Sequence, residues 1–154
     1  RQGQDVADAL AEYDGATVAA VDGPARGGGV ELALACDLRV CTSRSTFAES
    51  GVTLGLFGAW GGTGRLVDTV GRSVAMDLSL SGRVLDADEA LRAGLVSRVV
   101  DEPVAVARAV ADNDAGAVRA IKRLLADRAD HERQQARERE AFADLVAARG
   151  KRKD

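Results

Sequence analysis

The chain has 154 residues, 46% of them hydrophobic and 29% charged, which is the balance of one ordinary globular domain. Its formal net charge of −3 gives no general attraction to nucleic acid or anionic membranes, and no stretch approaches the ~20 apolar residues of a membrane-spanning helix. The only cysteines, Cys36 and Cys41, lack the further ligands of a zinc site; they indicate reduced thiols and a cytoplasmic location.

The first part of the chain alternates between helix and strand patterns. Apolar residues at helical spacing predict helices, and β-branched runs closed by turn residues predict buried strands. In chain order we expect a helix over 4–13, a strand over 17–23, a helix over 29–35, a strand over 37–43 and a mostly irregular, glycine-rich segment over 45–66.

Helical patterns dominate from residue 62 onward. Gly71 breaks the first of these helices, Asp86 is a candidate N-cap and Gly94 a candidate helix end. The expected elements are a helix up to residue 70, helices over 73–82 and 85–94, a strand over 95–101, and two or three helices after residue 103 with a break at 112–116. This order indicates an α/β region over residues 1–101 and a helical region over 102–154.

One segment, "GPARGGGVELALACD" over 23–37, places three glycines before a short apolar helix. The first N–H groups of a helix lack internal acceptors and carry partial positive charge, so this spot suits an anion or a developing oxyanion. The glycines match neither a Walker loop nor a dinucleotide fingerprint. Glu31 interrupts the apolar run; it is a candidate acid or base, or an ordinary first-turn acid of a helix.

Three blocks of the sequence belong together: "ATVAAVDGPARGGGVELALACDLRVCTSRSTFA", "GLFGAWGGTGRL" and "AMDLSLSGRVLDADEALRAGLVSRVV". In this order they resemble the enoyl-CoA hydratase/isomerase (crotonase) superfamily. The resemblance implies an α/β fold, a crotonase-like ββα spiral that is truncated here, with a C-terminal helical extension. It also implies a homotrimer or a dimer of trimers, with residues 1–101 as a partial spiral core and 102–154 as an oligomerisation region.

The resemblance implies an acyl-CoA thioester as the partner and no separate cofactor or metal, because coenzyme A is part of the substrate. Members of the family stabilise the thioester enolate with two backbone N–H groups, and one of these falls on Gly28. Their hydratases use two glutamates. The first matches Glu31, the second falls at Gly51, and Glu49 is an alternative displaced by about 6.6 Å along an extended chain.

The resemblance also implies substrate-binding positions. They are Ala25, Gly27, Gly51, Leu56, Ala59 and Trp60. Trp60, the only tryptophan, is either a pocket wall that limits acyl size or a core or interface residue.

The resulting hypothesis is an enzyme of acyl-CoA metabolism, as in fatty acid β-oxidation, that hydrates 2-enoyl-CoA thioesters. A family isomerase, decarboxylase or thioester hydrolase is an alternative, because the family changes its reaction by moving acid residues around a common oxyanion hole. A second alternative is a non-catalytic CoA-binding or assembly subunit, since Gly51 replaces a glutamate and the N-terminal part of the family fold has no counterpart. The chain is expected to be the C-terminal portion of a crotonase.

Overall fold

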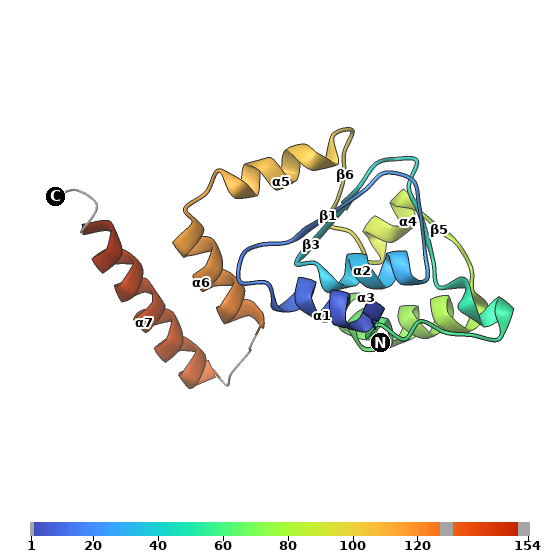
Figure 1. The fold of residues 1–154 in the computed structure, drawn as a ribbon, viewed down its shortest axis with the longest axis horizontal. Helices are drawn as coiled ribbons and strands as arrows, with labels where there is room; N and C mark the ends of the chain where they lie inside the picture. The colour runs from blue at the N-terminus through green and yellow to red at the C-terminus, as the bar shows by residue number, and fades with distance from the viewer. Residues whose placement is uncertain (1, 127–130, 151–154) are drawn as a thin grey trace. The chain divides into compact units, whose positions relative to one another are not determined.

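The computed structural model describes residues 2–126 and 131–150. The chain divides into two compact units, one made of Arg1–Tyr13 with Thr17–Ala109 and the other of Asp14–Ala16 with Val110–Asp154. Figure 1 shows the elements of both units in chain order. None of the described helices is both long enough and apolar enough to cross a membrane.

The first unit contains two small β-sheets. The first sheet has the order β1-β3-β6 and is parallel throughout, with strands β1 (Val18–Val21), β3 (Leu38–Cys41) and β6 (Arg98–Val99). The second has the order β2-β4-β5, with strands β2 (Pro24–Arg26), β4 (Thr46–Ala48) and β5 (Leu85–Asp86). In this sheet β2 and β4 are parallel, whereas β5 runs antiparallel to β4.

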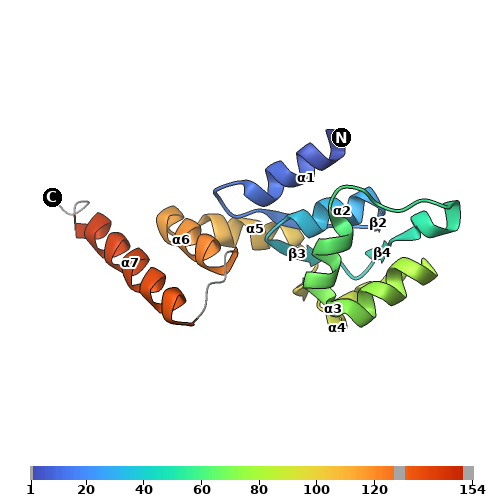
Figure 2. The ribbon, with the colours of Figure 1, turned by 90° about the horizontal axis from the view of Figure 1, so that it is seen from below.

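Helices pack against these sheets and against each other. They are α1 (Gln2–Glu12), α2 (Gly28–Ala35), the 3-10 helix η1 (Ser50–Leu54), α3 (Gly62–Ser81) and α4 (Ala87–Arg92). α2 contacts both α1 and α3, and Figure 2 shows it between them. α2 is therefore the central helix of this unit, and five of its eight residues are buried.

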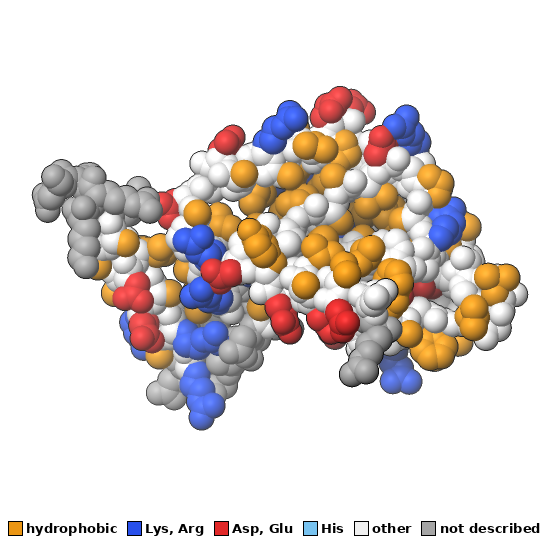
Figure 3. All heavy atoms as spheres, viewed as in Figure 1, with side chains coloured by type: hydrophobic (Ala, Val, Ile, Leu, Met, Phe, Trp, Pro, Cys, Tyr) orange, Lys and Arg blue, Asp and Glu red, His pale blue; other side chains and the backbone are white. Residues whose placement is uncertain are grey.

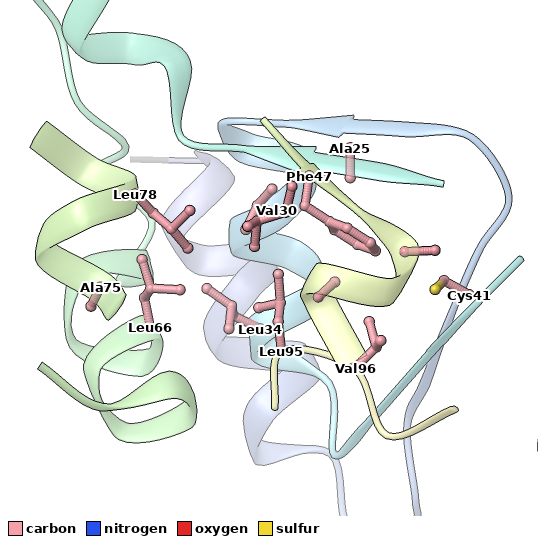
Figure 4. Packing of buried hydrophobic residues seen from close by; sticks show 13 residues of the cluster. Ala25, Val30, Leu34, Cys41, Phe47, Leu66, Ala75, Leu78, Leu95 and Val96 are labelled. Carbon is pink, nitrogen blue, oxygen red and sulfur yellow. The ribbon is translucent and has the colours of Figure 1, made fainter. Parts of the chain in front are cut away.

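The hydrophobic core lies around α2. Val30 and Leu34 of α2 meet Leu66 and Leu78 of α3 and Phe47 of β4, and each of these side chains is at most 5% exposed. Figure 4 shows these aliphatic side chains around the one aromatic ring of the cluster. Further hydrophobic side chains remain at the surface of the same unit (Figure 3). The core fixes α2 relative to α3 and β4, the elements that surround the candidate site.

The second unit is helical. It includes α6 (Ala115–Ala126) and α7 (His131–Gly150), which contact each other, and α5 (Pro103–Ala111) leads into it. Asp14 accepts hydrogen bonds from Arg123, the shorter at 2.6 Å. No residue of α6 is buried, and Ile121 and Leu125 are 55% and 69% exposed. The amphipathic pattern of α6 thus forms a helix whose apolar face remains largely in solvent.

Most of the expected elements are present, with differences at their ends. The break at Gly71 is confirmed: with φ 76° and ψ 159° this residue leaves the helical conformation and forms a kink between two helical parts of α3. The strand expected over 95–101 is shortened to Arg98–Val99, because Leu95 and Val96 are buried in the turn after α4 instead. The short strands β2 and β5 and the helix η1 have no periodic signal of their own and were not expected.

The predicted N-cap at Asp86 is confirmed as a complete capping box. The Asp86 carboxylate accepts the N–H of Glu89 at 2.7 Å, and the Glu89 carboxylate accepts the N–H of Asp86 at 3.1 Å. Gly94, with φ 76°, follows the end of α4 in the left-handed conformation. Because β5 pairs with β4, this capping box also supports the strand that leads to Glu49.

We expect Asp86→Ala to lower the free energy of unfolding by about 1 kcal/mol, because it removes an N-cap. Urea denaturation measures the change. Asp88→Ala is the matched control, since Asp88 is an exposed acid of the same helix turn. Equal losses from the two variants would show that the capping box contributes nothing beyond the charge.

Candidate active site

The start of α2 presents unpaired backbone donors. Gly27 adopts φ 46° and ψ −114°, a conformation that favours glycine, and its N–H donates to the carbonyl of Ala48 at 3.0 Å. Its carbonyl accepts the N–H of Val30 at 2.8 Å and that of Glu31 at 3.0 Å. The N–H of Gly28 has no backbone acceptor among the described residues. A helix-start N–H without an internal acceptor has the hydrogen-bonding capacity that an oxyanion donor needs.

Glu31 is buried, with 2% of its surface exposed. Its Oε1 accepts the N–H of Trp60 at 2.8 Å and the N–H of Gly62 at 3.0 Å. Gly62 is the first residue of α3, so the carboxylate lies at the N-terminus of that helix as well as in the first turn of α2. Both helix dipoles favour a negative charge at this position, and both hydrogen bonds require an acceptor oxygen.

Two glycines allow the loop before α3 to reach this carboxylate. A Cβ on Gly58 would lie 2.5 Å from Cδ of Glu31, and a Cβ on Gly62 would lie 2.6 Å from its Oε1. Neither glycine can carry a side chain without moving the carboxylate. Glycine is therefore required here by close approach of backbone to side chain.

The same loop is held from its other side by α1. Arg65 donates to the carbonyl of Trp60 at 2.8 Å and to the carboxylate of Asp8 at 2.8 Å. The Trp60 indole lies against Gly28, where a Cβ would be 2.5 Å from the ring, and against Gly3, where a Cβ would overlap it. The ring thus packs between α1 and α2. This position fits the packing interpretation of Trp60, although it also borders the Gly28 backbone.

A cavity of about 290 Å³ lies beside Glu31. Its lining is mostly apolar and comes from the segment around η1 and from α3. The residues are Glu31, Glu49, Val52, Leu56, Phe57, Gly58, Gly62, Thr63, Leu66, Ser79 and Leu80. Two carboxyl groups therefore share one apolar cavity.

Glu49 is the half-buried partner of Glu31 in this cavity. It directly follows β4 and precedes η1, and its Oε1 is buried without a hydrogen-bond partner among the described residues. Loss of solvent raises the pKa of the Glu49 carboxyl to about 7, and the charge of Glu31 adds to the rise. Glu49 is accordingly protonated over much of the acidic to neutral range.

The structure brings three of the predicted site residues into the cavity: Glu31, Glu49 and Leu56. The other predicted positions do not line the cavity. They are Ala25, Gly27, Gly28, Gly51, Ala59 and Trp60. A Cβ on Gly51 would lie 2.9 Å from the carbonyl oxygen of Leu56, so this position has no room for a side chain in the present backbone. The roles expected of these residues stay predictions.

Several contributors to the site were not expected from the sequence. Gly3 and Asp8 carry no motif, and the Arg65–Asp8 pair joins residues 57 positions apart. Gly58, Gly62 and Arg65 lie in the second block of the family resemblance, but the sequence predicted no contact between them and Glu31. Within residues 2–126 and 131–150, no group of three or more His, Cys, Asp or Glu side chains is placed to hold a metal ion.

An amide without a backbone acceptor lies at a glycine-rich helix start, one turn before a buried carboxylate, in an α/β arrangement that defines the crotonase fold class. The chain belongs to the enoyl-CoA hydratase/isomerase family, whose model matches residues 1–153. It is 47% identical over 97 residues to the probable enoyl-CoA hydratase echA8 of Mycobacterium tuberculosis, covering 62% of this chain and 38% of that protein. It is 41% identical over 114 residues to the short-chain-enoyl-CoA hydratase of Clostridioides difficile, covering 70% and 73%.

Solved structures agree with this assignment. An enoyl-CoA hydratase from Bacillus anthracis superposes with a TM-score of 0.86 at 29% identity, over 94% of this chain and 59% of that one. A Thermobifida fusca protein described as an enoyl-CoA hydratase, solved with CoA, superposes with a TM-score of 0.86 at 36% identity, over 96% and 61%. The chain thus spans about two fifths of the mycobacterial relative and about three fifths of these solved chains.

Gly62 should be essential for the two hydrogen bonds that hold the Glu31 carboxylate. We expect Gly62→Ala to destabilise the fold by about 1–3 kcal/mol, because its Cβ would collide with Glu31. Gly64→Ala, two residues further along α3, is the control: its Cβ meets nothing within 4 Å. That variant should be neutral or gain up to about 1 kcal/mol from helix propensity. Urea denaturation measures the free energy of unfolding of both variants. Equal changes would contradict a requirement for glycine at position 62.

The raised pKa of Glu49 should make stability depend on pH. The folded-state pKa of about 7 exceeds the ordinary value of 4.5, so the unfolded chain releases this proton first. The contribution of Glu49 to the free energy of unfolding should therefore fall as pH rises from about 4.5 through about 7.

Glu49→Gln removes this titration. The variant should gain about 1–2 kcal/mol relative to the unsubstituted chain between about pH 5 and about pH 8, a figure reduced for the partial solvent exposure of the group. Urea denaturation of the variant and of the unsubstituted chain at both pH values measures this difference in the free energy of unfolding. Glu12→Gln, at an exposed glutamate of α1, is the control. A difference that does not change with pH would show that Glu49 titrates normally.

Proposed function

We propose that this chain supplies the oxyanion amide and the acid–base glutamate of an enzyme that hydrates 2-enoyl-CoA thioesters. The observation that carries the proposal is the buried Glu31 carboxylate, which is fixed by two N–H donors and lines a cavity. It lies one helical turn after the unpaired N–H of Gly28. The relatives named as enoyl-CoA hydratases support the reaction class, and the Thermobifida fusca structures with CoA and acetoacetyl-CoA support the substrate class.

The chemistry requires these two groups for different steps. Addition of water to the double bond shifts negative charge onto the thioester oxygen, and a backbone N–H at a helix start stabilises that charge. An ionised carboxylate can take the proton from the attacking water. Glu31 suits this role because its Oε1 is held by the loop before α3. Its Oε2 accepts no hydrogen bond within the described part of the chain.

The proposed activity is that of the full-length relatives, and this chain matches only a part of their length. A cytoplasmic location is included in the same proposal and rests on the two free cysteines. A trimer or a dimer of trimers is also included and rests on the family resemblance. So does a role in fatty acid oxidation, which is also supported by a match to the fatty acid oxidation complex subunit alpha of Idiomarina loihiensis.

Glu31→Gln tests the proposal without disturbing the fold. A glutamine side-chain oxygen can still accept both loop N–H groups, but it cannot take up a proton. With crotonyl-CoA as substrate, followed by the loss of its enoyl absorbance, we expect turnover to fall ~10²–10⁴-fold. Glu12→Gln should leave the rate unchanged. No turnover by the unsubstituted protein, or equal turnover by Glu31→Gln, would overturn the hydratase proposal.

The alternative of a CoA-binding subunit without chemistry has two specific observations in its favour. The Trp60 ring lies against Gly28, and Gly51 has no room for a second acid. Calorimetric titration with acetyl-CoA and acetoacetyl-CoA distinguishes the two functions. Binding of both thioesters without turnover of crotonyl-CoA would favour the binding subunit.

A further inference from the structure

The two carboxyl groups of the cavity have opposite hydrogen-bond environments. Oε1 of Glu31 accepts two backbone N–H groups, an arrangement that suits the ionised form because an N–H can only donate. Oε1 of Glu49 is buried and accepts nothing among the described residues. A buried carboxyl oxygen without a donor disfavours ionisation, so the two groups differ in which form their surroundings stabilise.

The charges around Glu49 reinforce this difference. Glu31, from α2, is the one charged group that acts on its titration, and it opposes a second negative charge. Among the neighbouring elements, β4 and η1 carry no charged residue. Asp77 of α3 and Glu89 of α4 are paired with Arg83, at 2.7 Å and 3.1 Å. No cation is among the groups that shift the pKa of Glu49, so the Glu49 carboxyl keeps its proton up to about pH 7.

We propose that Glu49 holds this proton and is the proton donor of the site, while Glu31 is the ionised base. The proposal rests on the proposed function and deepens it, since it assigns the second carboxyl group of the reaction to this chain. Paired carboxyl groups whose surroundings favour different protonation states are a common basis for acid and base roles.

The assignment balances for the addition of water to a 2-enoyl thioester. Glu31 takes a proton from water as the water oxygen bonds to C3, and the C2–C3 π electrons move toward the thioester, forming an enolate. C2 then takes the proton of Glu49 as the enolate collapses back to the thioester. The product has gained one H and one OH. Glu31 now carries a proton and Glu49 is ionised, and transfer of the proton from Glu31 to Glu49 within the cavity restores the starting state.

The geometry of the neighbouring segment supports Glu49 over other positions. Glu49 leaves β4 at the edge of the cavity, and β4 is fixed on both sides by β2 and β5. The segment that follows turns back on itself, because the N–H of Leu56 donates to the carbonyl of Gly51 at 2.9 Å. This closed turn leaves no space for an acid at position 51.

The test combines kinetics with a direct titration of the carboxyl group. Turnover of crotonyl-CoA is measured from about pH 5 to about pH 9 for the unsubstituted chain and for Glu31→Gln, Glu49→Gln and Glu12→Gln. In parallel, carboxyl ¹³C resonances of glutamate-labelled protein are followed against pH, and Glu49→Gln identifies the resonance of Glu49.

We expect Glu49→Gln to lower turnover ~10²-fold or more while acetyl-CoA binding is retained. In the unsubstituted protein kcat should fall as pH rises through about 7, with the Glu49 resonance titrating over the same range. Glu12→Gln should leave kcat unchanged, and its kcat should show the same fall with rising pH.

Two results would overturn the assignment while leaving the hydratase proposal intact. One is an active Glu49→Gln with an unchanged pH profile beside an inactive Glu31→Gln. The other is a Glu49 resonance that titrates near the ordinary value of 4.5 in an active protein. Absence of turnover by the unsubstituted protein overturns the proposed function itself, and the role of Glu49 with it.

Discussion

The structure depends most on one side chain bonded to two helix beginnings. Glu31 belongs to the first turn of α2, and its Oε1 accepts the N–H of Gly62, where α3 starts. A buried carboxylate without donors would be very costly, so the loop before α3 must come close to it. That approach is possible because residues 58 and 62 are glycines. The cavity beside Glu31 follows from this arrangement, since α3 and the segment around η1 form its walls.

The loop is also fixed from outside the cavity, by a helix to which the sequence assigned no site. Asp8 of α1 pairs with Arg65, and Arg65 donates to the carbonyl of Trp60. The N–H of Trp60 is one of the two donors to Glu31. A connected series of hydrogen bonds therefore runs from the surface of α1 to the buried carboxylate. The position of Glu31 is set by contacts made in three helices, which explains how one carboxylate can be held rigidly in an otherwise apolar surrounding.

Local patterns predicted the helices and the principal strands, and they did so where the physical cause is local. The capping box at Asp86 and the left-handed Gly94 depend on residues within one turn of them. β2 and β5 could not be predicted in this way, because each exists only through its pairing with β4. Thr46 pairs with residues 24 and 86, and no short window of sequence contains these partners. The same reason applies to Arg65 and Asp8.

The candidate site shows the same division. The glycine triplet and Glu31 could be recognised from the sequence, whereas the surroundings of Glu49 depend on which oxygen the folded chain buries. Gly28 gains a second explanation from the structure. The Trp60 ring occupies the place that a Cβ at residue 28 would need, so glycine is required here for packing. Conformational freedom alone therefore does not account for this glycine, because the neighbouring ring independently excludes a side chain at residue 28.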